Sequence, residues 1–168
     1  MKQSDLVFLG DSLTMRHNWS DFKASNMGID GDTTAGILSR MHLAAKAKTI
    51  VLMIGVNDIL NQMPLNAIQR NYTKIMRKFS SDQHIYILSL LPVIDNVQTK
   101  KINQDIKTLN RWLKDQTKEY GFNHIDLYPD FLDKNKKGLK ENLTTDGIHL
   151  TPQAYRLWSK ILQTKLPQ

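Results

Sequence analysis

The stretch LVFLGDS, residues 6–12, joins a short apolar run to a glycine and two polar residues. Similar apolar runs, each followed by glycine or proline, lie within residues 48–54 and 84–91. Continuous apolar runs of this length are typical of strands that are buried on both faces. Two weaker strand candidates cover residues 24–28 and 123–127. The pattern therefore predicts a sheet of about five strands.

Amphipathic patterns separate these runs. Apolar residues recur with the period of a helix in four segments, at residues 37–45, 65–79, 102–113 and 154–162. Thr151 is the expected N-cap of the last helix, and Pro152 follows at its first position. Alternating strands and helices imply parallel strands, right-handed crossovers and helices on both faces. We predict an α/β fold, a three-layer α/β/α sandwich around a parallel sheet.

The composition is that of an ordinary globular protein, with 40% hydrophobic and 23% charged residues among 168. No linker or repeat divides residues 1–168, and we expect one domain. The absence of cysteine excludes a disulfide scaffold and a cysteine nucleophile. No apolar run approaches the roughly 20 residues of a membrane span. Taking Met1 as the native start, we find no secretory signal and expect a cytoplasmic protein without stable membrane insertion.

The formal net charge is +7, and lysines gather at residues 100–101 and 134–137. Such clusters form either a solvated basic face or a surface that attracts an anionic substrate. A nucleic-acid partner would require a basic stripe interleaved with aromatic residues, which this sequence lacks. We therefore expect a small-molecule substrate and no nucleic acid. The oligomeric state is left open by the sequence.

Polar segments follow the predicted strands. Ligands bind beyond the carboxyl ends of the strands in a parallel sheet, where these segments should meet at one edge. The segments are residues 10–12, 28–33 and 55–58, together with residues 146–149 before the last helix.

These segments contain the residues that acyl transfer requires. A serine hydroxyl is a weak nucleophile until a base removes its proton. Ser12 is the candidate nucleophile and His149 the candidate base, because histidine ordinarily titrates closest to neutral pH. Asp146 can orient the other ring nitrogen if residues 146–149 form a single turn.

The oxyanion of such a reaction needs fixed hydrogen-bond donors. The candidates are the backbone N–H of Ser12, the backbone N–H of Gly31 and the side-chain amide of Asn57. Each has a structural alternative: a serine can cap a helix, a glycine can serve a turn, and an asparagine can bond its own backbone.

Neighbouring residues are candidates for substrate binding: Asp11, Asp32 and Val56. Structural roles compete with this assignment. Asp11 can fix adjacent loops as a hydrogen-bond acceptor, and Asp32 can cap a helix that starts near Thr33. Trp19 follows the serine segment and is either a pocket wall or part of the core.

Four segments, residues 8–14, 31–33, 55–58 and 146–149, resemble in order the sequence blocks of the GDSL or SGNH hydrolases. In that family the first block carries the nucleophilic serine, and the last carries the aspartate and histidine of a catalytic triad. The glycine of the second block and the asparagine of the third donate to the oxyanion. The resemblance spans nearly the whole chain and assigns the same roles to the residues named above.

The resemblance implies a flavodoxin-like sheet, an acyl-enzyme mechanism, and neither metal nor cofactor. Family substrates include lysophospholipids, acyl thioesters, acetylated sugars and aryl esters. Residues 54–58 resemble the branch that contains platelet-activating-factor acetylhydrolase subunits and carbohydrate acetylesterases. We therefore expect hydrolysis of short-chain acyl or acetyl esters of a sugar or a lysophospholipid-like molecule, at an open and shallow site.

Three other functions compete with this hypothesis. A thioesterase or lysophospholipase would use the same residues. A metal-dependent phosphoesterase would use Asp11, Asp58, Asp146 and His149 as ligands, although the first strand lacks an Asp-x-His pair. A non-catalytic member would bind a glycan or lipid without hydrolysing it.

Overall fold

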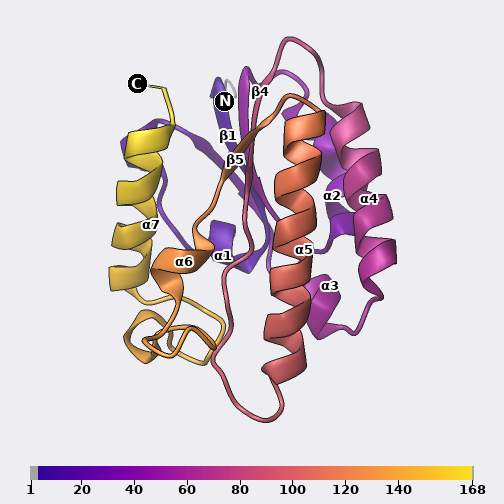
Figure 1. Ribbon diagram of the computed structural model, residues 1–168. Helices are drawn as coiled ribbons and strands as arrows, with labels where there is room; N and C mark the ends of the chain where they lie inside the picture. The colour runs from indigo at the N-terminus through magenta and orange to yellow at the C-terminus, as the bar shows by residue number, and fades with distance from the viewer. Residues whose placement is uncertain (1–3, 168) are drawn as a thin grey trace.

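The computed structural model describes residues 4–167 and contains a five-stranded parallel sheet between two layers of helices (Figure 1). The strands follow the order β2-β1-β3-β4-β5 across the sheet. Their bounds are β1 (Leu6–Gly10), β2 (Ser25–Gly28), β3 (Thr49–Met53), β4 (His84–Leu88) and β5 (Asn123–Ile125). The predicted α/β/α sandwich is confirmed.

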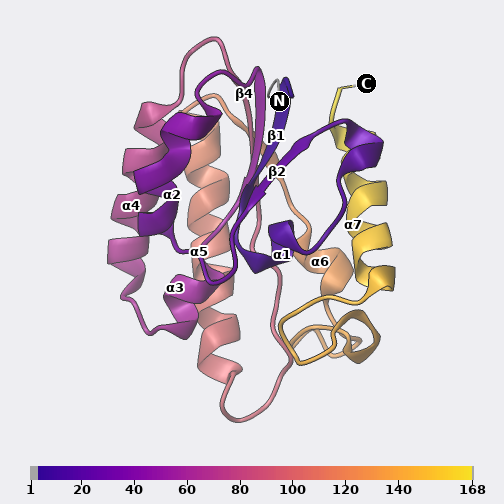
Figure 2. The same ribbon diagram turned by 180° about the vertical axis from the view of Figure 1, so that it is seen from behind.

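Seven α-helices and three short 3₁₀ helices are formed by the described residues. The α-helices are α1 (Ser12–Met15), α2 (Thr34–Arg40), α3 (Val56–Leu60), α4 (Leu65–Lys78), α5 (Lys100–Glu119), α6 (Tyr128–Phe131) and α7 (Pro152–Lys165). The 3₁₀ helices are η1 (Ser20–Phe22), η2 (Met41–Ala44) and η3 (Glu141–Leu143). Helices α2, α3, α4 and α5 lie on one face of the sheet, and α1, α6 and α7 lie on the other (Figures 1 and 2). None of the helices formed by residues 4–167 has the length and apolar character needed to cross a lipid bilayer.

Each face of the sheet has its own apolar core. Alternate residues of β1 point to opposite faces, as the pleat of a strand requires. Val7 and Leu9 pack with α2, α4 and α5, whereas Phe8 packs with α6 and α7. Trp19 is 1% exposed and stacks on Phe8 at 4.1 Å between ring centroids, which makes it part of the core and not a pocket wall. Burial on both faces explains why the strand sequences are continuously apolar.

The strand register brings the polar segments to one edge. Gly10, the last residue of β1, is paired with Gly28 of β2 on one side and with Met53 of β3 on the other. The residues that follow these three strands are therefore neighbours, although they lie far apart in the sequence. The expected convergence at the carboxyl edge is confirmed for these three segments.

The helix starts differ from the predictions in one place. Thr151 caps α7 as expected, because its side chain accepts a hydrogen bond from the N–H of Ala154. The prediction that Asp32 is the N-cap of α2 is wrong. Thr33 is the N-cap of α2, and its side-chain oxygen accepts from the N–H of Gly36.

Candidate active site

Ser12 is the first residue of α1 and lies at the carboxyl end of β1. Its Oγ is 3.2 Å from Nε2 of His149, a residue 137 positions further along the chain. Helix α1 and the segment that precedes α7 lie side by side at the lower edge of the sheet in Figure 2. Ser12 is 6% exposed, so its hydroxyl is largely enclosed. The predicted nucleophile and base are thus within hydrogen-bond distance of one another.

Asp146 and His149 lie on one tight turn. Oδ2 of Asp146 is 2.6 Å from Nδ1 of His149. The other carboxylate oxygen accepts the backbone N–H groups of Ile148 and His149, at 2.9 and 2.7 Å. Partial burial raises the pKa of Asp146, but these hydrogen bonds, chiefly that from the His149 ring, outweigh it and lower the pKa to about 2. The carboxylate is therefore ionised at neutral pH and faces the ring nitrogen opposite Ser12.

The turn is fixed by contacts with Thr144, just before it in the chain, and with the connection between β4 and α5. Gly147 has a φ of +94° and donates its N–H to Oγ of Thr144 at 2.8 Å. Its carbonyl accepts the N–H of Ile94, in the β4–α5 connection, at 2.8 Å. Thr144 also forms an isolated bridge with Leu150. These bonds hold the position of the imidazole relative to the sheet.

The three expected oxyanion donors lie on three neighbouring segments. The Gly31 N–H forms no hydrogen bond with any of residues 4–167, and Gly31 is exposed. The Nδ2 of Asn57 donates to the carbonyl of Asp32 at 2.9 Å. An amide nitrogen carries two hydrogens, so Asn57 retains a second donor. Ser12 occupies the first position of α1, where the N–H has no partner within the helix.

The candidate substrate-binding side chains are buried or bonded to other parts of the protein. Asp11 is 1% exposed and caps α1 by accepting the N–H of Leu13 at 2.9 Å. Burial raises the pKa of Asp11 to about 7. Val56 is 5% exposed and belongs to the core. Asp32 forms an ion pair with Arg40, at 2.6 Å between Oδ2 and Nη2. These positions give no support to the prediction that the three side chains contact a substrate.

A buried carboxylate, Asp58, supports the same edge. Its two oxygens accept the N–H of Thr34 at 3.0 Å and the hydroxyl of Thr34 at 2.6 Å. Asn71 in turn donates to that hydroxyl oxygen at 2.9 Å. Burial raises the pKa of Asp58. Asp58 thus joins α3 to the start of α2. Among residues 4–167, no three histidine or carboxylate side chains gather in a way that could hold a metal ion.

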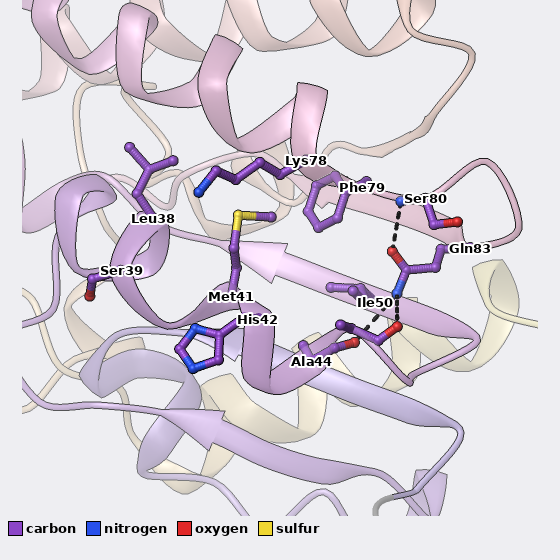
Figure 3. Close-up of a pocket in the computed structure, with 11 residues that line it drawn as sticks. Leu38, Ser39, Met41, His42, Ala44, Ile50, Lys78, Phe79, Ser80 and Gln83 are labelled. Carbon is purple, nitrogen blue, oxygen red and sulfur yellow. Dashed lines mark hydrogen bonds between the residues drawn. The ribbon is translucent and has the colours of Figure 1, made fainter.

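A pocket open to solvent lies at the opposite edge of the sheet. It has a volume of about 350 Å³ and is lined mainly by residues of η2, the end of α4 and the segment before β4 (Figure 3). Met41, Phe79 and Gln83 are among its lining residues, and none of the predicted site residues is. The pocket is therefore separate from the candidate active site.

The chain is similar to known proteins in both sequence and fold. The profile of the GDSL-like Lipase/Acylhydrolase family matches residues 4–157, and the chain belongs to this family. By family it is a hydrolase of carboxylic esters. No curated protein sequence matches the chain.

Solved structures share its fold. One structure, from Streptococcus pneumonia, is described as that of a platelet activating factor. It is 25% identical to this chain, with a TM-score of 0.87 over 99% of this chain and 85% of its own. A GDSL-like lipase from Bacteroides thetaiotaomicron is 20% identical, with a TM-score of 0.84 over 97% of this chain and 87% of its own. An acetyl xylan esterase is 18% identical, with a TM-score of 0.83 over 96% of this chain and 99% of its own.

Proposed function

We propose that this protein hydrolyses carboxylic esters through an acyl-enzyme formed on Ser12. The observation that carries the proposal is the series of contacts from Ser12 Oγ to His149 Nε2 and from His149 Nδ1 to Asp146 Oδ2, at 3.2 and 2.6 Å. This arrangement suits a hydroxyl nucleophile, a base and a carboxylate that orients the base.

In the first half of the reaction, Oγ of Ser12 attacks the ester carbonyl carbon and Nε2 of His149 takes the hydroxyl proton. The carbonyl oxygen becomes an oxyanion. When this intermediate collapses, the bond to the alcohol oxygen breaks and His149 returns the proton to that oxygen. The alcohol leaves, and the acyl group remains on Ser12.

In the second half, water attacks the acyl carbon while His149 accepts a proton from it. Collapse of the second intermediate releases the carboxylic acid and restores the Ser12 hydroxyl. Asp146 remains ionised throughout and stabilises the imidazolium that forms in each half. No step requires a metal ion or a cofactor.

The oxyanion of both intermediates would be bound by three donors: the backbone N–H groups of Ser12 and Gly31, and the side chain of Asn57. Their placement on adjacent strand ends supports this role, as does the N–H of Gly31, which lacks an acceptor among the described residues. Each donor of this kind typically accounts for about 10²–10³ in rate.

For the substrate, we propose small acetyl or other short-chain acyl esters, with a sugar or a lysophospholipid-like alcohol. Family membership supports an acyl ester. The likeness in fold to an acetyl xylan esterase is compatible with a sugar ester. A chain-length series of p-nitrophenyl esters, an acetylated xylan, a lysophospholipid and an acyl thioester would rank these classes and would separate an esterase from a thioesterase or a lysophospholipase.

The central experiment compares Ser12→Ala with the wild type on p-nitrophenyl acetate. We expect the variant to fold normally and to lose hydrolysis, and we expect a fluorophosphonate probe to label only the wild type. Ser81→Ala is a matched control, because Ser81 is exposed and lies in the connection between α4 and β4. Hydrolysis retained by Ser12→Ala would refute the proposal.

Two further results would favour the alternatives. Activity that disappears with EDTA and returns with Mn²⁺ would indicate a metal-dependent phosphoesterase. Failure of the probe to label Ser12, together with no turnover of any ester, would indicate a protein that only binds its ligand.

A further inference from the structure

Arg40, the last residue of α2, makes its polar contacts with the backbone around the candidate oxyanion donors and with one carboxylate. Its Nη2 donates to the carbonyl of Gly10 at 2.9 Å, and its Nη1 donates to the carbonyl of Met27 at 2.8 Å. Its Nε donates to Oδ2 of Asp32 at 2.8 Å. Each of the three guanidinium nitrogens therefore donates a hydrogen bond.

These contacts join the segments that carry the donors. Gly10 ends β1 and lies two residues before Ser12, whereas Met27 lies near the end of β2 and leads to Gly31. Asp32 follows Gly31 directly. One side chain thus fixes the carboxyl end of β1 relative to the connection between β2 and α2.

The third donor is attached to the same unit. The backbone carbonyl of Asp32 accepts Nδ2 of Asn57 at 2.9 Å, while its carboxylate pairs with Arg40. The carboxylate of Asp32 therefore binds Arg40, which fixes β1, and its backbone carbonyl binds Asn57, the candidate donor on α3. Displacement of Asp32 would move Gly31 and Asn57 relative to Ser12.

The ion pair is enclosed, with 12% of the Arg40 side chain and 10% of the Asp32 side chain exposed. A buried ion pair contributes little net stability, since desolvation of the two charges offsets their attraction. What it does provide is a fixed geometry, because the planar guanidinium group has a rigid set of donors.

We propose that Arg40 is a positioning residue that, through Asp32, sets the separation of the Ser12, Gly31 and Asn57 donors. This inference rests on the proposed function. Arg40 acts through the backbone carbonyls that it binds and not through the substrate. Its loss should therefore impair stabilisation of the transition state more than binding of the substrate.

The test compares Arg40→Gln and Arg40→Lys with the wild type, and Arg77→Gln on α4 is the control for loss of an exposed arginine. A misplacement of catalytic groups by about 1 Å can cost about 10² in rate, so we expect kcat of Arg40→Gln to fall by about 10²-fold at nearly constant KM. Arg40→Lys should recover little, because an ammonium group cannot reproduce three separated donors.

A second variant disturbs the pair without removing either charge. The Cα of Gly36 packs against Asp32, and a Cβ added there would lie 1.6 Å from Oδ1 of Asp32. Alanine is favoured over glycine within a helix by about 1 kcal/mol, so helix propensity alone would not make Gly36→Ala harmful. We expect Gly36→Ala to lower kcat as Arg40→Gln does.

A readout independent of esterase activity completes the test. In ¹H–¹⁵N spectra, the amides of Ser12 and Gly31 and the side-chain amide of Asn57 should shift in Arg40→Gln and remain unchanged in Arg77→Gln. Folded Arg40→Gln protein with wild-type kcat and unshifted amides would overturn the positioning role, as would a rise in KM alone. Activity that survives Ser12→Ala would instead refute the proposed function.

Discussion

The carboxylate of Asp146 and the imidazole of His149 are joined twice within one turn: Oδ2 is 2.6 Å from the ring Nδ1, and Oδ1 is 2.7 Å from the backbone nitrogen of the same histidine. The carboxylate thus fixes both the ring and the backbone that carries it. Hydrogen bonding to the ionised form keeps the pKa of Asp146 at about 2. Both functions of an orienting carboxylate, position and charge, are supplied by a local contact.

Asp146→Asn retains the size of the side chain and removes its charge. We expect kcat to fall by about 10²–10⁴, because the imidazolium formed during proton transfer loses its partner. KM should change little. Steady-state kinetics on p-nitrophenyl acetate measures both constants, with Asp82→Asn as a surface control. Wild-type kcat in Asp146→Asn would contradict the proposed role.

Gly147→Ala should disturb the turn that carries His149. The residue has a φ of +94°, and an added Cβ would lie 2.6 Å from Cγ2 of Ile94. Strained conformations of this kind cost about 1–3 kcal/mol each. We expect a lower kcat and a lower thermal midpoint, measured by kinetics and by circular dichroism. Gly121→Ala is the matched control, since its φ is +70° and no atom lies within 4 Å of the added Cβ. Equal kcat values in the two variants would count against the turn as the support of the base.

Asn57→Ala removes one candidate oxyanion donor. We expect kcat to fall by about 10²–10³, the usual effect of losing such a donor. Asn57→Asp should be at least as harmful, because its carboxylate would face the developing negative charge. Asn66→Ala, at the start of α4, controls for loss of an exposed amide. Kinetics of the three variants at one pH provides the comparison, and a rise in KM without loss of kcat would point to a substrate contact instead.

Asp11→Asn should change how stability depends on pH. Burial raises the pKa of Asp11 from 3.8 to about 7, so the folded state retains a proton that the unfolded state has released between these values. The contribution of Asp11 to the free energy of unfolding therefore falls as pH rises from about 4 to about 7. Asparagine caps a helix as well as aspartate does and does not titrate.

Relative to the wild type, Asp11→Asn should gain about 2–4 kcal/mol of stability between pH 4 and pH 8. Urea unfolding at the two pH values measures this difference, and Asp82→Asn is the control for a change of charge. A difference that does not vary with pH would show that Asp11 is ionised in the folded protein throughout the range.

The strands and the site edge could be predicted because both leave a local pattern. Burial on two faces makes β1, β3 and β4 continuously apolar, and polar residues follow where each strand ends. Helices α3 and α6 span 5 and 4 residues and were not predicted, because they are too short to show a period. The sequence does not distinguish Asp32 from Thr33 as the cap of α2, because the two residues are adjacent and both are good capping residues.

Arg40 could not be found from the sequence. Two of its partners are backbone carbonyls, of Gly10 and Met27, which any residue could present. Its carboxylate partner, Asp32, lies outside α2, so the pair shows no helical spacing. The contacts depend on how α2 packs over the ends of two strands, which only the tertiary structure determines.

The proton-transfer pair has two separate anchors. The hydroxyl of Ser12 is fixed by the sheet, whereas the imidazole of His149 depends on a loop tied to the β4–α5 connection by the bond between Ile94 and Gly147. Breaking that bond would loosen the turn, which Thr144 also holds, and would displace the base from the nucleophile while the sheet and the oxyanion donors stay in place. Under the proposed mechanism, inactivation by heat or mild denaturant should therefore precede unfolding of the core.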